Sequence, residues 1–210
     1  MLIHQGSRPL ESGRLLLRPF VPGDVRDMFH NWCSDPQVVR YLSWPYHQSI
    51  QTTDAVLHSW VEAQRQKNVY RWGIVLRAEG NHVVGCIDVV GANDSLLCAE
   101  IGYALSRRLW GQGIMTEALG LVLDYLFGCG YIRLCACHDV ENPASGRVMK
   151  KAGMQFEGIL RSARRTNRGF CDVAQYAILT TDPRPAIQAP PALAGAKIRY
   201  ENPHERMLMK

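Results

Sequence analysis

The chain has 210 residues, 47% of them hydrophobic and 20% charged, with a formal net charge of +5. These values are typical of one soluble α/β domain, or at most two small ones. The modest positive charge suits a polyanionic small ligand, but no Lys/Arg block is long enough to argue for nucleic acid. No apolar run reaches the length of a membrane span, and residues 1–5 lack signal-peptide features, so we expect a cytoplasmic protein with no membrane partner.

The seven cysteines are an odd number, and most of them lie inside apolar runs. This pattern favours buried, reduced thiols over a disulfide framework. Cys135, Cys137 and His138 could suggest a metal site. However, residues two apart on a strand share a face, and no second ligand pair follows at finger-like spacing, so we expect packing and no metal.

Apolar periodicity and turn residues predict the elements of the first half of the chain. The expected order is a strand over residues 11–20, a helix from Asp24 to about Cys33, a second helix from Ser49 or Thr52 to about Lys67, and a hairpin of residues 71–77 with 82–90. Between the two helices lies an aromatic segment, residues 41–47. Its rings either plug the core under a loop or line a substrate pocket.

A strand over residues 99–105 and a helix over residues 114–127 meet at Gly111 and Gly113. Glycines there let the backbone approach a ligand closely, and free amides at a helix start favour an anionic phosphate. Arg107 and Arg108 add positive charge beside this junction. Two glycines are also typical of an ordinary strand-to-helix turn, so the pattern by itself does not identify a ligand.

The remaining elements are a strand over residues 132–137, a short helix that Asn142 would cap and Gly153 would end, and two strands over residues 154–165 and 170–180. We expect residues 1–182 to form the domain. Residues 183–210 are rich in proline and alanine and are expected to form an extended or partner-bound tail.

This order of elements, with the motif Arg108 to Gly113, resembles the GNAT superfamily of acetyl-CoA-dependent N-acetyltransferases. The resemblance covers about residues 11–182. It is strongest to the branch that acetylates the N-terminal alanine or serine of ribosomal proteins. The segments that carry this likeness are Ala99 to Tyr103, Gly113 to Ala118, Asn142 to Ser145, and Lys151 to Met154.

The resemblance implies an α+β (GNAT) fold, a mixed, mostly antiparallel, splayed sheet of about seven strands flanked by helices. It also implies acetyl-CoA as cosubstrate, with its pantetheine arm along the strand before the motif and its pyrophosphate on the amides of the junction. The residues then expected to bind it are Ile101, Tyr103, Leu105, Arg107, Arg108, Leu109, Trp110, Gly111, Gln112, Gly113, Ile114, Asn142 and Ser145.

Acetyl transfer to an amine needs a base for the ammonium proton and a donor for the departing thiolate. Glu100 shares one strand face with Gly102 and Ala104, whose small size should leave room for a ligand. The resemblance makes Glu100 the expected base, although a strand-end carboxylate can also simply pair with an arginine. Ser145 is the expected general acid, with Tyr103 and Tyr176 as alternatives, and a backbone amide near the strand splay would hold the oxyanion.

The acceptor could be a peptide N-terminus or a small amine, such as an amino acid, a polyamine or an amino-bearing drug. An acyl-CoA sensor without turnover is the competing hypothesis. A Rossmann dinucleotide-binding protein is disfavoured, since the third glycine of that motif and a preceding repeated βαβ unit are absent. Thirty residues follow Thr180, and they are expected to cover the acceptor site or to reach the second subunit of a homodimer.

Overall fold

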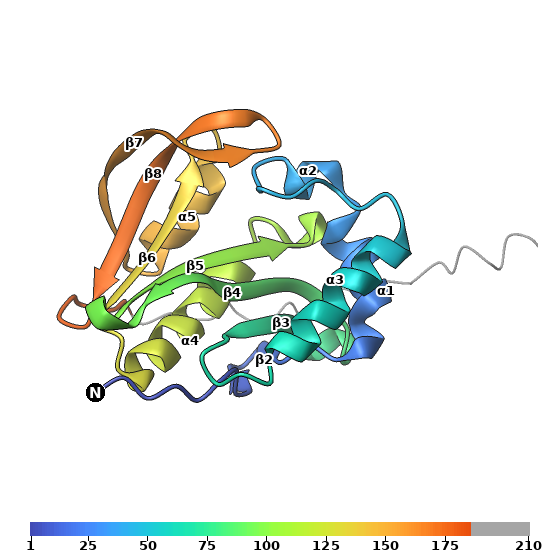
Figure 1. Cartoon of the computed structure of the whole chain (residues 1–210), viewed down its shortest axis with the longest axis horizontal. Helices are drawn as coiled ribbons and strands as arrows, with labels where there is room; N and C mark the ends of the chain where they lie inside the picture. Colours follow the sequence, from blue (N-terminus) through green and yellow to red (C-terminus); the bar gives the residue numbers. More distant parts are fainter. Residues whose placement is uncertain (186–210) are drawn as a thin grey trace, which may run out of the picture.

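The computed structural model describes residues 1–185, and the tail expected over 183–210 lies almost wholly outside them. Eight strands form one mixed sheet in the order β1-β2-β3-β4-β5-β6-β8-β7 (Figure 1). The strands are β1 (Leu10–Glu11), β2 (Leu15–Arg18), β3 (Arg71–Leu76), β4 (Val83–Asn93), β5 (Cys98–Leu105), β6 (Arg133–Asp139), β7 (Gln155–Thr166) and β8 (Gly169–Leu179). The expected mixed, mostly antiparallel sheet is confirmed, with one strand more than the sequence predicts.

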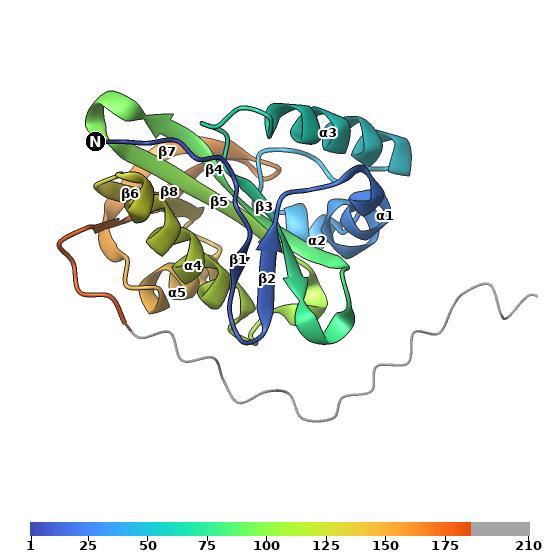
Figure 2. The same ribbon diagram turned by 90° about the horizontal axis from the view of Figure 1, so that it is seen from below.

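Helices cover both faces of the sheet (Figures 1 and 2). They are α1 (Val25–Met28), which continues as the π-helix η2 (Phe29–Cys33), then α2 (Pro36–Val39), α3 (Ile50–Ala63), α4 (Ile114–Cys129) and α5 (Pro143–Lys151). One buried cluster joins the sheet to α4 and α5, and a second joins it to α1, η2 and α3. No helix within residues 1–185 is long and apolar enough to cross a membrane.

The sheet opens between the parallel strands β5 and β6. These strands pair only at three positions, which end at Glu100 opposite Cys135. All other neighbouring strands are antiparallel. Beyond this point β5 runs on through Leu105 beside β4, while β6 runs on through Asp139 beside β8. The two halves of the sheet therefore part where the resemblance predicts a splay.

The chain departs from the expected elements mainly near its start. The expected first strand is instead a small hairpin of β1 and β2, with a turn at Ser12. The Ser12 amide donates to the Leu15 carbonyl, and the Leu15 amide donates to Ser12 Oγ. Asp24 does not cap α1 with its side chain. Asn142 likewise makes no side-chain cap for α5. By contrast, Ser49 caps α3 at the Thr52 amide, as expected.

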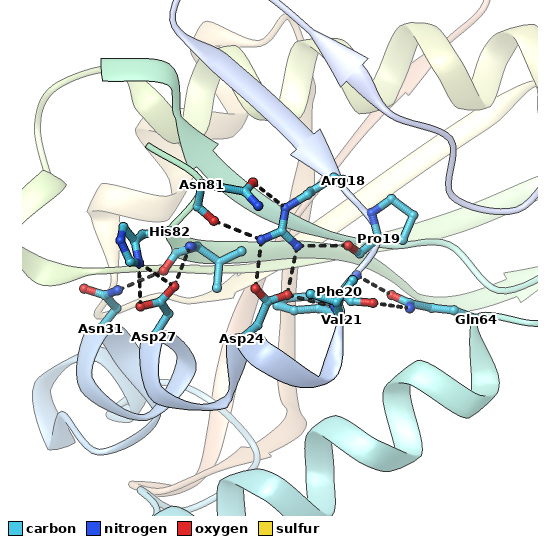
Figure 3. Close-up of polar contacts among 11 residues, drawn as sticks. Arg18, Pro19, Phe20, Val21, Asp24, Asp27, Asn31, Gln64, Asn81 and His82 are labelled. Atoms are coloured by element: carbon cyan, nitrogen blue, oxygen red, sulfur yellow. Dashed lines mark hydrogen bonds and ion pairs between the residues drawn. The ribbon is translucent and has the colours of Figure 1, made fainter. Parts of the chain in front are cut away.

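Asp24 instead joins a polar cluster that ties α1 to the sheet (Figure 3). The guanidinium of Arg18 donates to both carboxylate oxygens of Asp24 at 2.8 Å and to the side chain and carbonyl of Asn81. The hydrogen bond to Asp24 raises the pKa of Arg18. Asp24 is only 3% exposed, so this buried pair connects the start of α1 to β2.

The cysteine thiols within the described residues are all free, three of them buried and four partly exposed.

The aromatic segment 41–47 divides between the two roles that its sequence left open. Trp44 packs against the cluster beneath α1 and α3, and His47 is buried. Tyr41 and Leu42 line a cavity.

His47 makes the stability of the fold depend on pH. Its Nδ1 lies 2.8 Å from the Thr53 hydroxyl, and burial lowers its pKa below the ordinary 6.5. The unfolded chain then binds more protons than the folded chain once the pH falls below that value, so folding is weakened by acid. In urea titrations at about pH 7.5 and about pH 5, the wild type should lose more unfolding free energy than His47→Asn. An equal loss in both proteins would contradict this assignment.

Candidate active site

A cavity of about 330 Å³ occupies the opening between β5 and β6. It is lined by residues of α2, the end of β5, the start of α4, the end of β6 and α5. The residues expected to bind the coenzyme that line it are Ile101, Tyr103, Leu105, Leu109, Trp110, Gly111, Gly113, Ile114, Asn142 and Ser145. The cavity therefore brings the junction and the Asn142 to Ser145 segment together from opposite sides of the splay.

The junction carries free amides at the start of α4. Gly111 and Gly113 have φ values of +77° and +76°, a left-handed conformation that favours glycine. The first backbone hydrogen bond of α4 runs from the Glu117 amide to the Gly113 carbonyl. Within residues 1–185, the backbone amides from Gly111 to Thr116 donate to no protein acceptor. A Cβ at Gly111 would meet no atom within 4 Å, so the space beside this residue is open.

Three residues expected to bind the coenzyme lie outside the cavity lining. Arg107 pairs with Asp35 at 2.9 Å, and Arg108 pairs with Glu79 at 2.5 Å. The side-chain amide of Gln112 donates from Nε2 to the Arg108 carbonyl oxygen at 2.9 Å. These acids come from distant parts of the chain, so the local sequence did not indicate that they neutralise the two arginines.

Tyr103 and Ser145 meet inside the cavity. The Tyr103 hydroxyl lies 2.7 Å from Ser145 Oγ and 3.2 Å from the Ser145 carbonyl oxygen. Burial raises the pKa of Tyr103, so its hydroxyl stays protonated at neutral pH. Ser145 therefore has a neutral hydrogen-bond partner beside it.

Glu100 lies just outside the cavity, on the sheet face opposite α4. Both of its carboxylate oxygens accept from Arg164 Nη2 at 2.6 Å, and the Cys137 thiol donates to one of them at 3.5 Å. Burial and the charge of Glu100 raise the pKa of Cys137. Glu100 therefore lies near the splay, as expected. It also pairs with an arginine, which is the alternative role that the sequence left open.

Asp88 is a second carboxylate on this face, and the sequence interpretation missed it. Its Oδ2 accepts two hydrogen bonds from Arg71 at 3.0 Å, and burial raises its pKa. The space expected over Gly102 is filled, since a Cβ there would meet Val90 at 2.7 Å. A bulge in β4 next to Val90 brings this side chain over the glycine. Alternation along β4 could have indicated Asp88, but the bulge could not be foreseen.

Other cavity residues were also missed. They include Gln37 and Val38 of α2, Cys137, His138 and Asp139 of β6, and Ala144, Arg147, Val148 and Lys151 of α5. Arg147 and Lys151 are four residues apart and so share one face of α5. Neither has an acidic partner within residues 1–185. The four-residue spacing of Arg147 and Lys151 could have indicated a shared basic face of α5. The α2 residues reach the cavity only through tertiary packing, which the sequence does not show.

Among the described residues, no group of three or more His, Cys, Asp or Glu side chains is arranged to hold a metal ion.

Comparison with known proteins assigns this chain to a family. The sequence model of the family described as "Acetyltransferase (GNAT) domain" matches residues 14–155. The chain belongs to the GNAT acetyltransferases. It is an acyltransferase that uses acetyl-CoA, whose thioester supplies an acetyl group that an amine can attack.

Three similar proteins illustrate this membership. An uncharacterized N-acetyltransferase of Bacillus subtilis, YoaA, is 30% identical over 171 residues, covering 81% of this chain and 96% of the relative. The ribosomal-protein-serine acetyltransferase of Escherichia coli is 37% identical over 81 residues, covering 38% of this chain and 45% of that enzyme. The crystal structure of a GNAT acetyltransferase from Bacillus anthracis superposes with a TM-score of 0.71 at 25% identity, covering 82% and 98% of the two chains. The GNAT fold of this chain is thereby confirmed.

Proposed function

We propose that this GNAT enzyme acetylates the N-terminal amine of a protein or peptide. The observation that carries the proposal is the open face on which Glu100 lies. Val90 is 59% exposed and the Arg164 side chain is 51% exposed. Binding sites for small molecules usually enclose most of the ligand surface. An open face instead admits a chain terminus that remains attached to a large body.

Acetyl-CoA would occupy the cavity on the other side of the splay. The backbone of Ile101 to Leu105 is unpaired toward β6, so it would hydrogen-bond the pantetheine amides as an added strand. The free amides from Gly111 to Thr116 and the N-terminal end of the α4 dipole would hold the pyrophosphate. Arg147 and Lys151 add positive charge to the same cavity. These features support the fit of an elongated anionic ligand.

The roles of the side chains follow from their positions. Glu100 would take the proton of the acceptor ammonium, directly or through water, and this requires Arg164 to release it. Ser145 would donate a proton to the leaving thiolate, with the Tyr103 hydroxyl holding the Ser145 side chain in place. The similarity to the Escherichia coli ribosomal-protein-serine acetyltransferase supports a protein acceptor, although that match covers only 38% of this chain.

A small amine is the second candidate acceptor, and one contact favours it. Asn167, at the tip of the β7–β8 hairpin, donates to the carbonyl oxygens of Val39, Leu42 and Trp44. This contact joins the tip of the hairpin to the segment after α2 (Figure 1), whose Tyr41 and Leu42 line the cavity. An acceptor that entered beneath it would be enclosed and therefore small.

Thiol release from acetyl-CoA with a panel of acceptors distinguishes the two candidates. Peptides that begin with alanine or serine should be turned over with a higher kcat/KM than free amino acids, polyamines or amino-bearing drugs. The same peptides with an acetylated N-terminus are the matched control and should give no thiol release. A higher kcat/KM for a free small amine, or equal turnover of the blocked peptides, would contradict the proposal.

A further inference from the structure

Four arginines lie within eight residues of the β7–β8 hairpin, and their partners differ. Arg168 pairs with Asp139 and Glu141 and lies over the Tyr41 ring. Arg165 lies over the ring of Phe170 at 5.9 Å. Arg161 has no acidic partner within residues 1–185, and neither has Arg165. The hairpin therefore carries more positive charge than its surroundings neutralise.

Arg164 is the arginine of this group that reaches the reacting side of the splay. The strand register shifts between Leu160 and Arg164, so that three residues of β7 stand opposite one residue of β8. Ser162 lies within this bulge at a φ of +48°, and its amide donates to the Asp172 carboxylate at 2.8 Å. The bulge places Arg164, rather than Ser162, opposite Cys171 and within reach of Glu100.

The pair of Arg164 and Glu100 presents a difficulty for a cationic acceptor. One guanidinium nitrogen contacts both carboxylate oxygens, which are the atoms that an acceptor ammonium must approach. Removing that carboxylate from Arg164 would leave a guanidinium beside an incoming cation, which is unfavourable for both. An acceptor that carries a carboxylate close to its amine removes the conflict. The pair of Arg164 with Glu100 is then replaced by two pairs, Arg164 with the acceptor carboxylate and Glu100 with the acceptor ammonium.

We infer that the acceptor is an acidic peptide, whose carboxylate near the N-terminus binds Arg164 while its terminal amine takes the place of Arg164 at Glu100. The inference rests on the proposed function and names the substrate class of the same site. Arg161 provides a second cation on the same bulge for a further acidic residue. Arg164 is half exposed, so its long side chain can turn away from Glu100 without leaving solvent.

The test compares two peptides that differ only in charge, Ala-Asp-Glu and Ala-Asn-Gln, each followed by the same neutral sequence. The wild type should acetylate the acidic peptide with a kcat/KM at least about tenfold higher, mainly through KM, and the preference should shrink as salt is added. Arg164→Gln should reduce the preference to less than about threefold, since the neutral amide side chain cannot form a charge-assisted ion pair with a carboxylate.

Arg165→Gln is the matched control, because it makes the same change at the next residue, whose guanidinium lies over Phe170. It should keep the wild-type preference and salt dependence. If both peptides are acetylated equally by the wild type, or if Arg164→Gln keeps the full preference, this inference is overturned while the proposed function stands. If neither peptide is acetylated, the proposed function is overturned together with it.

Discussion

Gly111→Asp is expected to lower the affinity for acetyl-CoA by at least about a hundredfold while the protein still folds. The change places a carboxylate in the open space beside Gly111, next to the free backbone amides that are proposed to hold the pyrophosphate. Like charges brought together in such a site repel each other strongly. Aspartate tolerates a left-handed φ better than most residues, so the backbone at +77° should be retained.

Gly111→Asn distinguishes the effect of the added negative charge from the effect of placing a side chain at a left-handed backbone position. Asparagine has the same shape and the same tolerance of the left-handed region, but it carries no charge. Isothermal titration calorimetry should show a much smaller loss for the asparagine variant than for the aspartate variant. Thermal unfolding without ligand should give similar midpoints for the two variants. Wild-type affinity in Gly111→Asp would remove the pyrophosphate from this junction.

Glu100→Gln is expected to lower kcat near neutral pH by about a hundredfold or more, which is the usual contribution of a positioned base. The affinity for acetyl-CoA should change little, because Glu100 lies outside the cavity lining. The pH–rate profile of kcat should also change in the variant, because a glutamine side chain cannot accept the proton of the acceptor. An unchanged pH–rate profile would exclude Glu100 from the mechanism.

Asp88→Asn is the matched control for that experiment. Asp88 is the other carboxylate described on this face of β4 and β5, and it is held by Arg71 in much the same way as Glu100 is held by Arg164. Burial raises the pKa of Asp88, a property that also suits a base. Asp88→Asn should keep the wild-type pH–rate profile. A changed profile in this variant, together with an unchanged profile in Glu100→Gln, would assign the base to Asp88.

The order of the elements could be predicted because local signals mark most of them. Alternation and turn residues indicate the hairpin of β3 with β4, and Gly130 ends α4 in a left-handed conformation. The start of the chain was less predictable. Asp24 is a good capping residue by type, but its carboxylate is taken by Arg18 from a neighbouring strand, which tertiary structure alone decides.

In the site too, features with a local sequence signal could be predicted and features set by tertiary structure could not. The glycines of the junction and the Asn142 to Ser145 segment could be identified because each is a short motif, and the fold places both on the cavity. The partners of the charged residues could not be. Arg164 and Glu100 are 64 residues apart in the chain, and Arg107 and Asp35 are 72 apart. Such pairings depend on the splay, on the bulge in β7 and on the packing of α2, none of which leaves a local signal.

The most direct test of the proposed function is the position of the acetyl group in a peptide that offers two amines. An alanine-starting peptide with one internal lysine is incubated with acetyl-CoA and the 210-residue protein, and fragment-ion mass spectrometry locates the label. We expect acetylation at the N-terminal amine, with the lysine unmodified. Acetylation of the lysine alone, or of neither amine while free amino acids or polyamines are acetylated, would contradict it.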